Sequence, residues 1–157
     1  MNLSNLSLFL FAALFFMIAS QAGYFFTGYY KVLQGMSTMD FMLIRKSTDA
    51  AVRTSYKFLY ISAMLAGIAV LVLHRNELGS VRGTLMCIAV FFLLADLVLA
   101  KTVSEPVNSI IGNTPMEQLI NMPGLQEKWL NMILVRGALS LAGFLLLMSS
   151  LVFASRY

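Results

Sequence analysis

Apolar residues fill four long stretches of the chain, and polar residues collect between them. The stretches cover approximately residues 6–28, 56–74, 83–104 and 129–153. Each is long enough for a helix to cross the roughly 30 Å hydrocarbon layer of a membrane, which takes about 20 residues. Lipid offers the backbone no hydrogen-bond partner, and the alternating pattern of barrel strands is missing, so the stretches should be helical. The pattern predicts an all-α fold: one domain over residues 1–157, built as a four-helix transmembrane bundle.

Composition supports a membrane environment. Hydrophobic residues make up 59% of the chain and charged residues only 11%, whereas about a quarter of a soluble domain is charged. The first five residues contain no Lys or Arg, so we expect the first stretch to be a membrane span rather than a secretory signal. The lone cysteine, Cys87, excludes an internal disulfide. The net charge of +4 is too scattered for a nucleic-acid surface, so no nucleic-acid partner is expected.

The three connections differ in character. In the first, Ser37 to Asp40 has the pattern of a capping box, which predicts a helix start. The residues that follow put Met39, Met42 and Leu43 on one side and Arg45, Lys46 and Asp49 on the other. This pattern predicts a short interfacial helix, lying on the membrane surface between the first and second spans.

The second connection, residues 74–82, is short and favours antiparallel neighbours. The third, residues 104–128, contains Pro106, Pro115 and Pro123 and is predicted to be a loop. Small residues four apart predict close helix packing, either within the bundle or between subunits. These pairs are Ala19/Gly23, Ala63/Gly67 and Ala138/Ala142.

The distribution of basic residues predicts the orientation. The face with the first and third connections carries Lys31, Arg45, Lys46, Arg53, Lys57, Lys101 and Lys128, and the other face carries Arg75, Arg82 and Arg156. The positive-inside rule therefore places both longer connections in the cytoplasm and both termini outside, in a membrane that we expect to be the bacterial inner (cytoplasmic) membrane.

Ionisable residues at membrane depth are costly and indicate functional sites. Lys101 and Glu105 are four apart, and Asn108 follows at the same end of the third span. Because Pro106 disfavours a continuing helix, we expect the helix to end near Ser104 and the next residues to form a turn. An ordinary helix-end ion pair is the alternative interpretation of this group.

Two further charges lie deeper in the spans. Arg136 is seven residues after Trp129 on the same helical face, and Glu105 is its predicted partner. Asp96 points to the opposite side of its helix from Glu105. We expect Asp96 to pair with Lys57 or Arg53 of the second span or to stay protonated, acting either as a structural pair or as a proton carrier.

Further polar residues are expected in the same bilayer half as Glu105 and Arg136. They are Gln21 of the first span and Tyr56, Lys57 and Tyr60 of the second. This concentration predicts a pocket open towards one face, and the many Met and Phe residues suit an apolar ligand. Neither a cofactor motif nor a metal-ligand cluster is recognisable, so we expect no cofactor and no metal.

The arrangement resembles the anthrone oxygenase-like family of small four-helix membrane proteins, mostly uncharacterised in bacteria. The resemblance spans most of the chain. It rests on Gln21-Ala22-Gly23, a charged helix around Arg45, Glu105-Pro106-Val107-Asn108, and Trp129 followed by Arg136. Fungal relatives imply cofactor-independent oxygenation of polycyclic anthrones. Ile133 stands where the resemblance leads us to expect a polar residue, with Asn131 nearby.

Two hypotheses follow. In the first, a polar-lined pocket in one leaflet binds an apolar aromatic or lipid-like small molecule, as an anthrone oxygenase-like monooxygenase or a binding protein. Catalytic roles would fall to Glu105 as base or anchor and to Arg136 and Lys101, which would stabilise negative charge. The ligand-binding residues would be Gln21, Arg45, Lys57, Asn108 and Trp129. In the second, the chain is a non-enzymatic accessory or scaffold subunit. Its partners would be membrane lipid and either further copies of itself or a partner membrane subunit.

Overall fold

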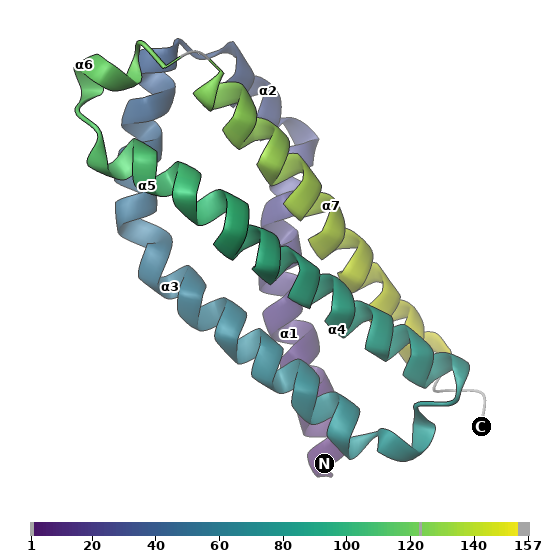
Figure 1. Ribbon diagram of the computed structural model, residues 1–157. Coiled ribbons are helices and arrows are strands. Elements are labelled where there is room, and N and C mark those ends of the chain that lie inside the picture. Colours follow the sequence, from purple (N-terminus) through teal and green to yellow (C-terminus); the bar gives the residue numbers. More distant parts are fainter. Residues whose placement is uncertain (1, 123, 154–157) are drawn as a thin grey trace.

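The computed structural model describes residues 2–122 and 124–153 and contains no strand among them. Four long helices run up and down in a bundle (Figure 1). They are α1 (Leu3–Tyr24), α3 (Thr38–Leu73), α4 (Val81–Leu99) and α7 (Leu125–Val152). All four lie in helical segments long and apolar enough to cross a membrane. The predicted all-α, four-helix bundle is confirmed.

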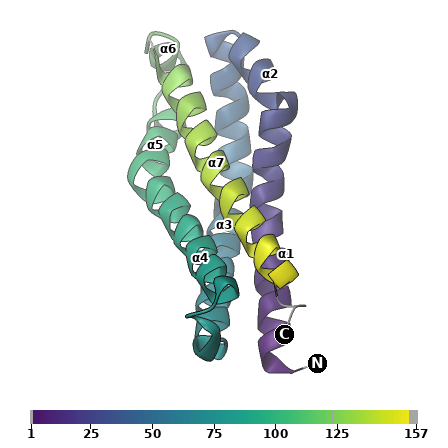
Figure 2. The same ribbon diagram turned by 90° about the vertical axis from the view of Figure 1, so that its right-hand side faces the viewer.

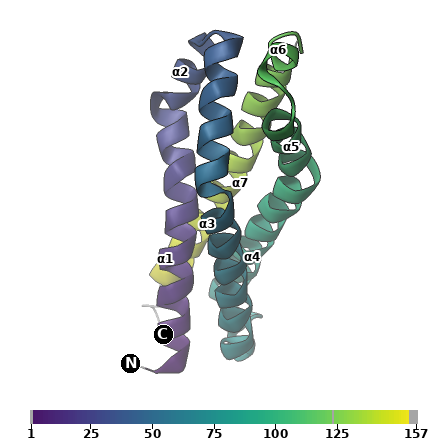
Figure 3. The same cartoon turned by 90° about the vertical axis from the view of Figure 1, so that its left-hand side faces the viewer.

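Shorter elements connect the long helices. α2 (Tyr30–Gly35), α5 (Glu105–Asn113) and α6 (Met116–Leu119) lie at one end of the bundle, whereas α1 begins and α7 ends at the other (Figures 2 and 3). The first and third connections therefore share one end, as antiparallel neighbours require. Pro123 and Arg156, which entered the sequence predictions, lie outside the described residues.

The predicted interfacial helix is wrong, because the second span and the segment before it form one continuous helix. The backbone N–H of Asp40 donates to Ser37 Oγ at 3.1 Å, so the predicted helix start is correct. From there α3 continues for 36 residues, about 54 Å and well beyond the hydrocarbon thickness. Phe41 and Met42 are fully buried against the rest of the bundle. That burial favours a helix standing along the bundle over one lying on the membrane.

The helix was also predicted to end near Ser104, and this too is wrong. A π-helical turn over Ala100–Ser104 joins α4 to α5, and the bend at this junction is visible in Figure 2. Pro106 cannot donate to the carbonyl four residues earlier, which would interrupt a regular helix. It stands instead in the first turn of α5, where a missing N–H is tolerated.

Two apolar cores fill the bundle. The first, towards the termini, includes Phe11, Phe15 and Leu93. The second, towards α2 and α6, includes Phe41 and Trp129. The apolar stretches supply the first core, whereas much of the second comes from the connections, including Leu33, Phe41 and Ile111.

Small residues permit the close packing that was predicted within the bundle. A Cβ on Gly67 would lie 3.1 Å from a ring carbon of Phe11, and Ala63 is fully buried. Ala138 is exposed, so it takes no part in close packing within the bundle; the alternative, packing between subunits, stays a prediction there. A tighter site, not predicted, is Gly143, where a Cβ would lie 2.7 Å from the Phe15 ring.

Candidate functional site

A buried polar network separates the two apolar cores, with Asp96 at its centre. Its carboxylate accepts hydrogen bonds from Arg136 Nε at 2.6 Å, Tyr60 OH at 2.6 Å and Ser140 Oγ at 2.7 Å. The Arg136 guanidinium also donates to Tyr60 OH at 2.9 Å and to Ser104 Oγ at 3.1 Å. The Asp96 side chain is only 1% exposed. Each charge in this network therefore has a partner, as a buried charge requires.

This network corrects two sequence predictions. Arg136 pairs with Asp96 rather than with Glu105, and Asp96 pairs with neither Lys57 nor Arg53. The reason is geometric: Asp96 lies inside the bundle against Arg136 and Ser140 of α7, while Glu105 lies at its surface against Lys57 of α3. The partner of Asp96 is decided by which side chains of α4 and α7 face each other. Residue spacing along a single helix does not reveal that relationship.

Glu105 instead belongs to a charged group at the side of the bundle. Its carboxylate lies 2.5 Å from Lys101 Nζ and 3.8 Å from Lys57 Nζ. Both lysine side chains are mostly exposed, at 74% and 61%. Lys101 and Glu105 form an i,i+4 pair on one face, because the chain stays helical from α4 through Pro106.

Trp129 forms a second group nearer the end of the bundle. Its indole N–H donates to Asn108 Oδ1 at 2.9 Å. The guanidinium carbon of Arg45 lies 4.2 Å from the centroid of its ring, in a cation–π contact. Phe41 packs edge-on against the same indole. Asn108 and Trp129 are thus neighbours, although they are 21 positions apart in the sequence.

These three groups surround one cavity of about 820 Å³. Its walls come from α1, α3, the α4–α5 segment and α7. All eight residues predicted as catalytic or ligand-binding lie on its lining: Gln21, Arg45, Lys57, Lys101, Glu105, Asn108, Trp129 and Arg136. Two π-helical turns, Phe25–Tyr29 and Ala100–Ser104, also contribute to it. Such irregular turns are often found at functional sites.

The eight residues do not act as one cluster. Arg136 is held in the buried network, Glu105 and Lys101 form the charged group on the side, and Trp129 and Asn108 form the group near the end of the bundle. Gln21 is exposed and lines the cavity from α1. The proposed trio of Glu105, Lys101 and Arg136 is therefore divided between two groups.

Sequence reasoning missed three members of the buried network. Ser104 and Ser140 were assigned no role, and Tyr60 was grouped with the polar residues of one bilayer half but was given no partner. One signal was available: Arg136 and Ser140 are four residues apart and therefore share a face of α7.

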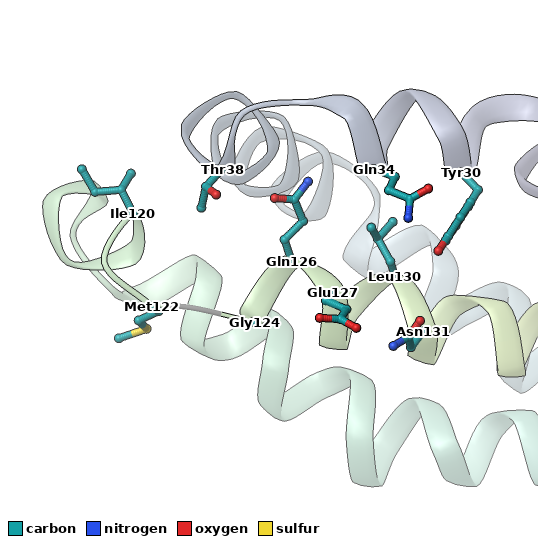
Figure 4. Close-up of a pocket in the computed structure, with 10 residues that line it drawn as sticks. All are labelled: Tyr30, Gln34, Thr38, Ile120, Met122, Gly124, Gln126, Glu127, Leu130 and Asn131. Atoms are coloured by element: carbon teal, nitrogen blue, oxygen red, sulfur yellow. The ribbon is translucent and has the colours of Figure 1, made fainter.

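A second, smaller hollow of about 360 Å³ lies at the α2–α6 end of the bundle (Figure 4). Gln126 lines it and donates to the carbonyl of Leu33 at 2.8 Å, which ties α7 to α2. Asn131 lines this hollow, whereas Ile133 lines the large cavity. Asn131 therefore does not supply the polar group that Ile133 lacks.

Within residues 2–122 and 124–153, His, Cys, Asp and Glu side chains form no group able to hold a metal ion. Comparison of the chain with protein-family models, curated proteins and solved structures finds no match. The resemblance to the anthrone oxygenase-like family accordingly stays a prediction, and the case for function is carried by the geometry of the cavity.

Proposed function

We propose that this membrane protein binds an apolar aromatic or lipid-like small molecule in the cavity between α3 and α7. The observation that carries the proposal is the combination of an apolar wall with a few convergent polar groups in one space of about 820 Å³. Cavities of roughly 300–1,000 Å³ with this kind of lining are typical of small-molecule sites.

The packing of the helices supports access from the side. α3 packs mainly against α1, and α4 mainly against α7, so the α3–α4 contact is the weaker one. Lining residues on both sides of this seam are exposed, namely Lys57, Ile61 and Lys101. In a bilayer, a molecule dissolved in the adjacent leaflet would reach the cavity here without crossing the apolar core near the termini.

The buried network has a different part in the proposal. Asp96, Arg136 and Tyr60 form a closed set of bonds, so they fix the rotation of α3, α4 and α7 and form the floor of the cavity. Arg136 is then a positioning residue. The scaffold hypothesis accounts for this closed network, but it leaves the cavity above it without a role.

If the bound molecule is also a substrate, the reaction that we propose is the oxygenation of an anthrone. In that reaction dioxygen converts the ring CH₂ to C=O, with the second oxygen atom leaving as water. Of the two lining carboxylates outside the buried network, Asp49 pairs with Arg53 on its own helix, whereas Glu105 lies beside Lys101 and Lys57, which would stabilise an enolate. Oxygen uptake with added anthrone, compared between the wild type and Glu105→Gln, tests this activity.

Binding itself can be tested through Trp129, the single tryptophan of the chain, which lies on the cavity wall. The protein in phosphatidylcholine nanodiscs would be titrated with 9,10-dibromostearate and its methyl ester, because bromine quenches an indole on contact. We expect saturable quenching by at least one of them, weakened by Ala100→Phe, which fills the cavity. Ala138→Phe, on an exposed face of α7, is the matched control and should bind normally. Weak, linear quenching identical in all three proteins would refute the proposal.

We also propose the membrane in which the protein lies and its orientation there. We place the chain in the bacterial inner membrane, with the α2–α6 end in the cytoplasm. The excess of basic residues at that end supports this orientation.

A further inference from the structure

Arg45 stands apart from the other charged residues that line the cavity. Among the described residues it takes part in no ion pair and no hydrogen bond, and its Nε is buried without a partner. The face of its guanidinium stacks on Trp129, with the guanidinium carbon 4.2 Å from the ring centroid. The donor-bearing edge of the group is left unused, and this edge has the planar geometry that matches a carboxylate or phosphate.

The carboxylates that line the cavity with Arg45 form ion pairs with other basic residues. Asp49, one turn along α3, attracts Arg45 electrostatically but forms its ion pair with Arg53. Glu105 pairs with Lys101 and Lys57. Asp96 pairs with Arg136. The lining thus carries two more cations than carboxylates: Arg45, Arg53, Lys57, Lys101 and Arg136 against Asp49, Asp96 and Glu105.

An unpaired, partly buried cation costs free energy unless a counter-charge is supplied. We propose that the ligand supplies it: the cavity takes an acidic amphiphile, whose single anionic group binds Arg45 while its apolar body lies along the lining. This inference rests on the proposed function and narrows its ligand class. A neutral hydrocarbon would fill the same space and leave Arg45 without a partner.

The wild-type protein provides the first test, because it needs no variant to fold. In the Trp129 titration, 9,10-dibromostearate should bind about tenfold to a hundredfold more tightly than its uncharged methyl ester, the range of a hydrogen-bonded charge pair. Arg45→Gln should remove most of this preference, and Arg45→Lys should retain part of it. Arg75→Gln, an exposed arginine at the opposite end of the bundle, is the matched control and should keep the full preference.

Phospholipid probes separate the two sources of such an acid. Quenching by dibrominated phosphatidylglycerol that depends on Arg45 would identify a lipid headgroup, and quenching by the free acid alone would identify a free organic acid. Equal affinity for the acid and the ester, unchanged in Arg45→Gln, would overturn the inference while leaving the proposed binding function intact. Absence of saturable quenching by every probe would overturn both.

Discussion

Asp96 of α4 and Arg136 of α7 form an ion pair at 2.6 Å between the two apolar cores of the bundle. From Val81 to Asp96 the helix rises about 22 Å, which leaves the pair within a 30 Å hydrocarbon layer if α4 begins at its surface. Tyr60, Ser104 and Ser140 complete the hydrogen bonding of the two charges. The network therefore joins three of the four long helices at one level.

The first prediction concerns this pair. Asp96→Asn and Arg136→Met should each destabilise the protein by about 3–5 kcal/mol, because the remaining charge is left buried and alone. The double variant should recover much of the loss, since the amide oxygen that replaces the carboxylate can still accept from Tyr60 and Ser140. Thermal unfolding in detergent measures the cycle. Glu105→Gln, which alters only the exposed pair, should change the midpoint little; a loss comparable to that of Arg136→Met would contradict the assignment.

Asp96 also illustrates what the sequence allows one to predict. The length of the apolar stretches predicted the four spans, because a helix that crosses lipid must be long and apolar. Helical rotation correctly separated Asp96 of α4 from Glu105, the first residue of α5. It could not identify Arg136 as the partner of Asp96, because that depends on how α4 and α7 are rotated against each other.

Two predicted helix boundaries were wrong, the separate interfacial helix before the second span and the helix end near Ser104, and both errors have local causes. The polar residues of α3 resemble a surface helix when taken alone, and only the burial of Phe41 and Met42 in the second core favours a continuous helix. Pro106 disfavours a helix interior, but the π-helical turn before it makes it a first-turn residue. The residues lining the cavity were nevertheless predicted together, because polar side chains are so rare elsewhere in the spans.

A second prediction concerns the Trp129 group. Asn108→Leu removes the acceptor of the buried indole N–H and should destabilise the protein by about 1–3 kcal/mol. Combining it with Trp129→Phe, which removes the donor as well, should cost less than the sum of the two single changes. Asn113→Leu serves as the control, because its side chain is exposed and bonds only to Ser109. Additive losses would show that the hydrogen bond contributes nothing.

Helix packing supplies a third prediction. Gly143→Ala would place a methyl group 2.7 Å from the Phe15 ring and 2.9 Å from the Cβ of Phe92, and overpacking of this kind typically costs about 1–3 kcal/mol. Gly23→Ala meets no atom within 4 Å, so it should be neutral or slightly stabilising. Thermal unfolding of the two variants provides the comparison. Equal midpoints would mean that the helices are less tightly packed at Gly143 than the structure indicates.

The fourth prediction is the orientation. After replacement of Cys87 by Ala, a single cysteine at exposed Asn5 should react with a membrane-impermeant maleimide added to intact cells. One at exposed Gln118 in α6 should react only after the membrane is permeabilised. Ser155, an alternative position near the C-terminus, lies outside the described residues. Labelling of Gln118→Cys with protection of Asn5→Cys would reverse the orientation.

Photoaffinity mapping in bilayers tests the central claim, ligand binding in the cavity, most directly. A fatty acid carrying a diazirine on its chain would be crosslinked at trace concentration and the modified residues identified by mass spectrometry. The account predicts that labels concentrate on lining residues such as Val52, Tyr56 and Leu97, and that excess unlabelled acid removes them. Labels spread over exposed faces at Phe58 and Leu94, and unaffected by the competitor, would contradict it.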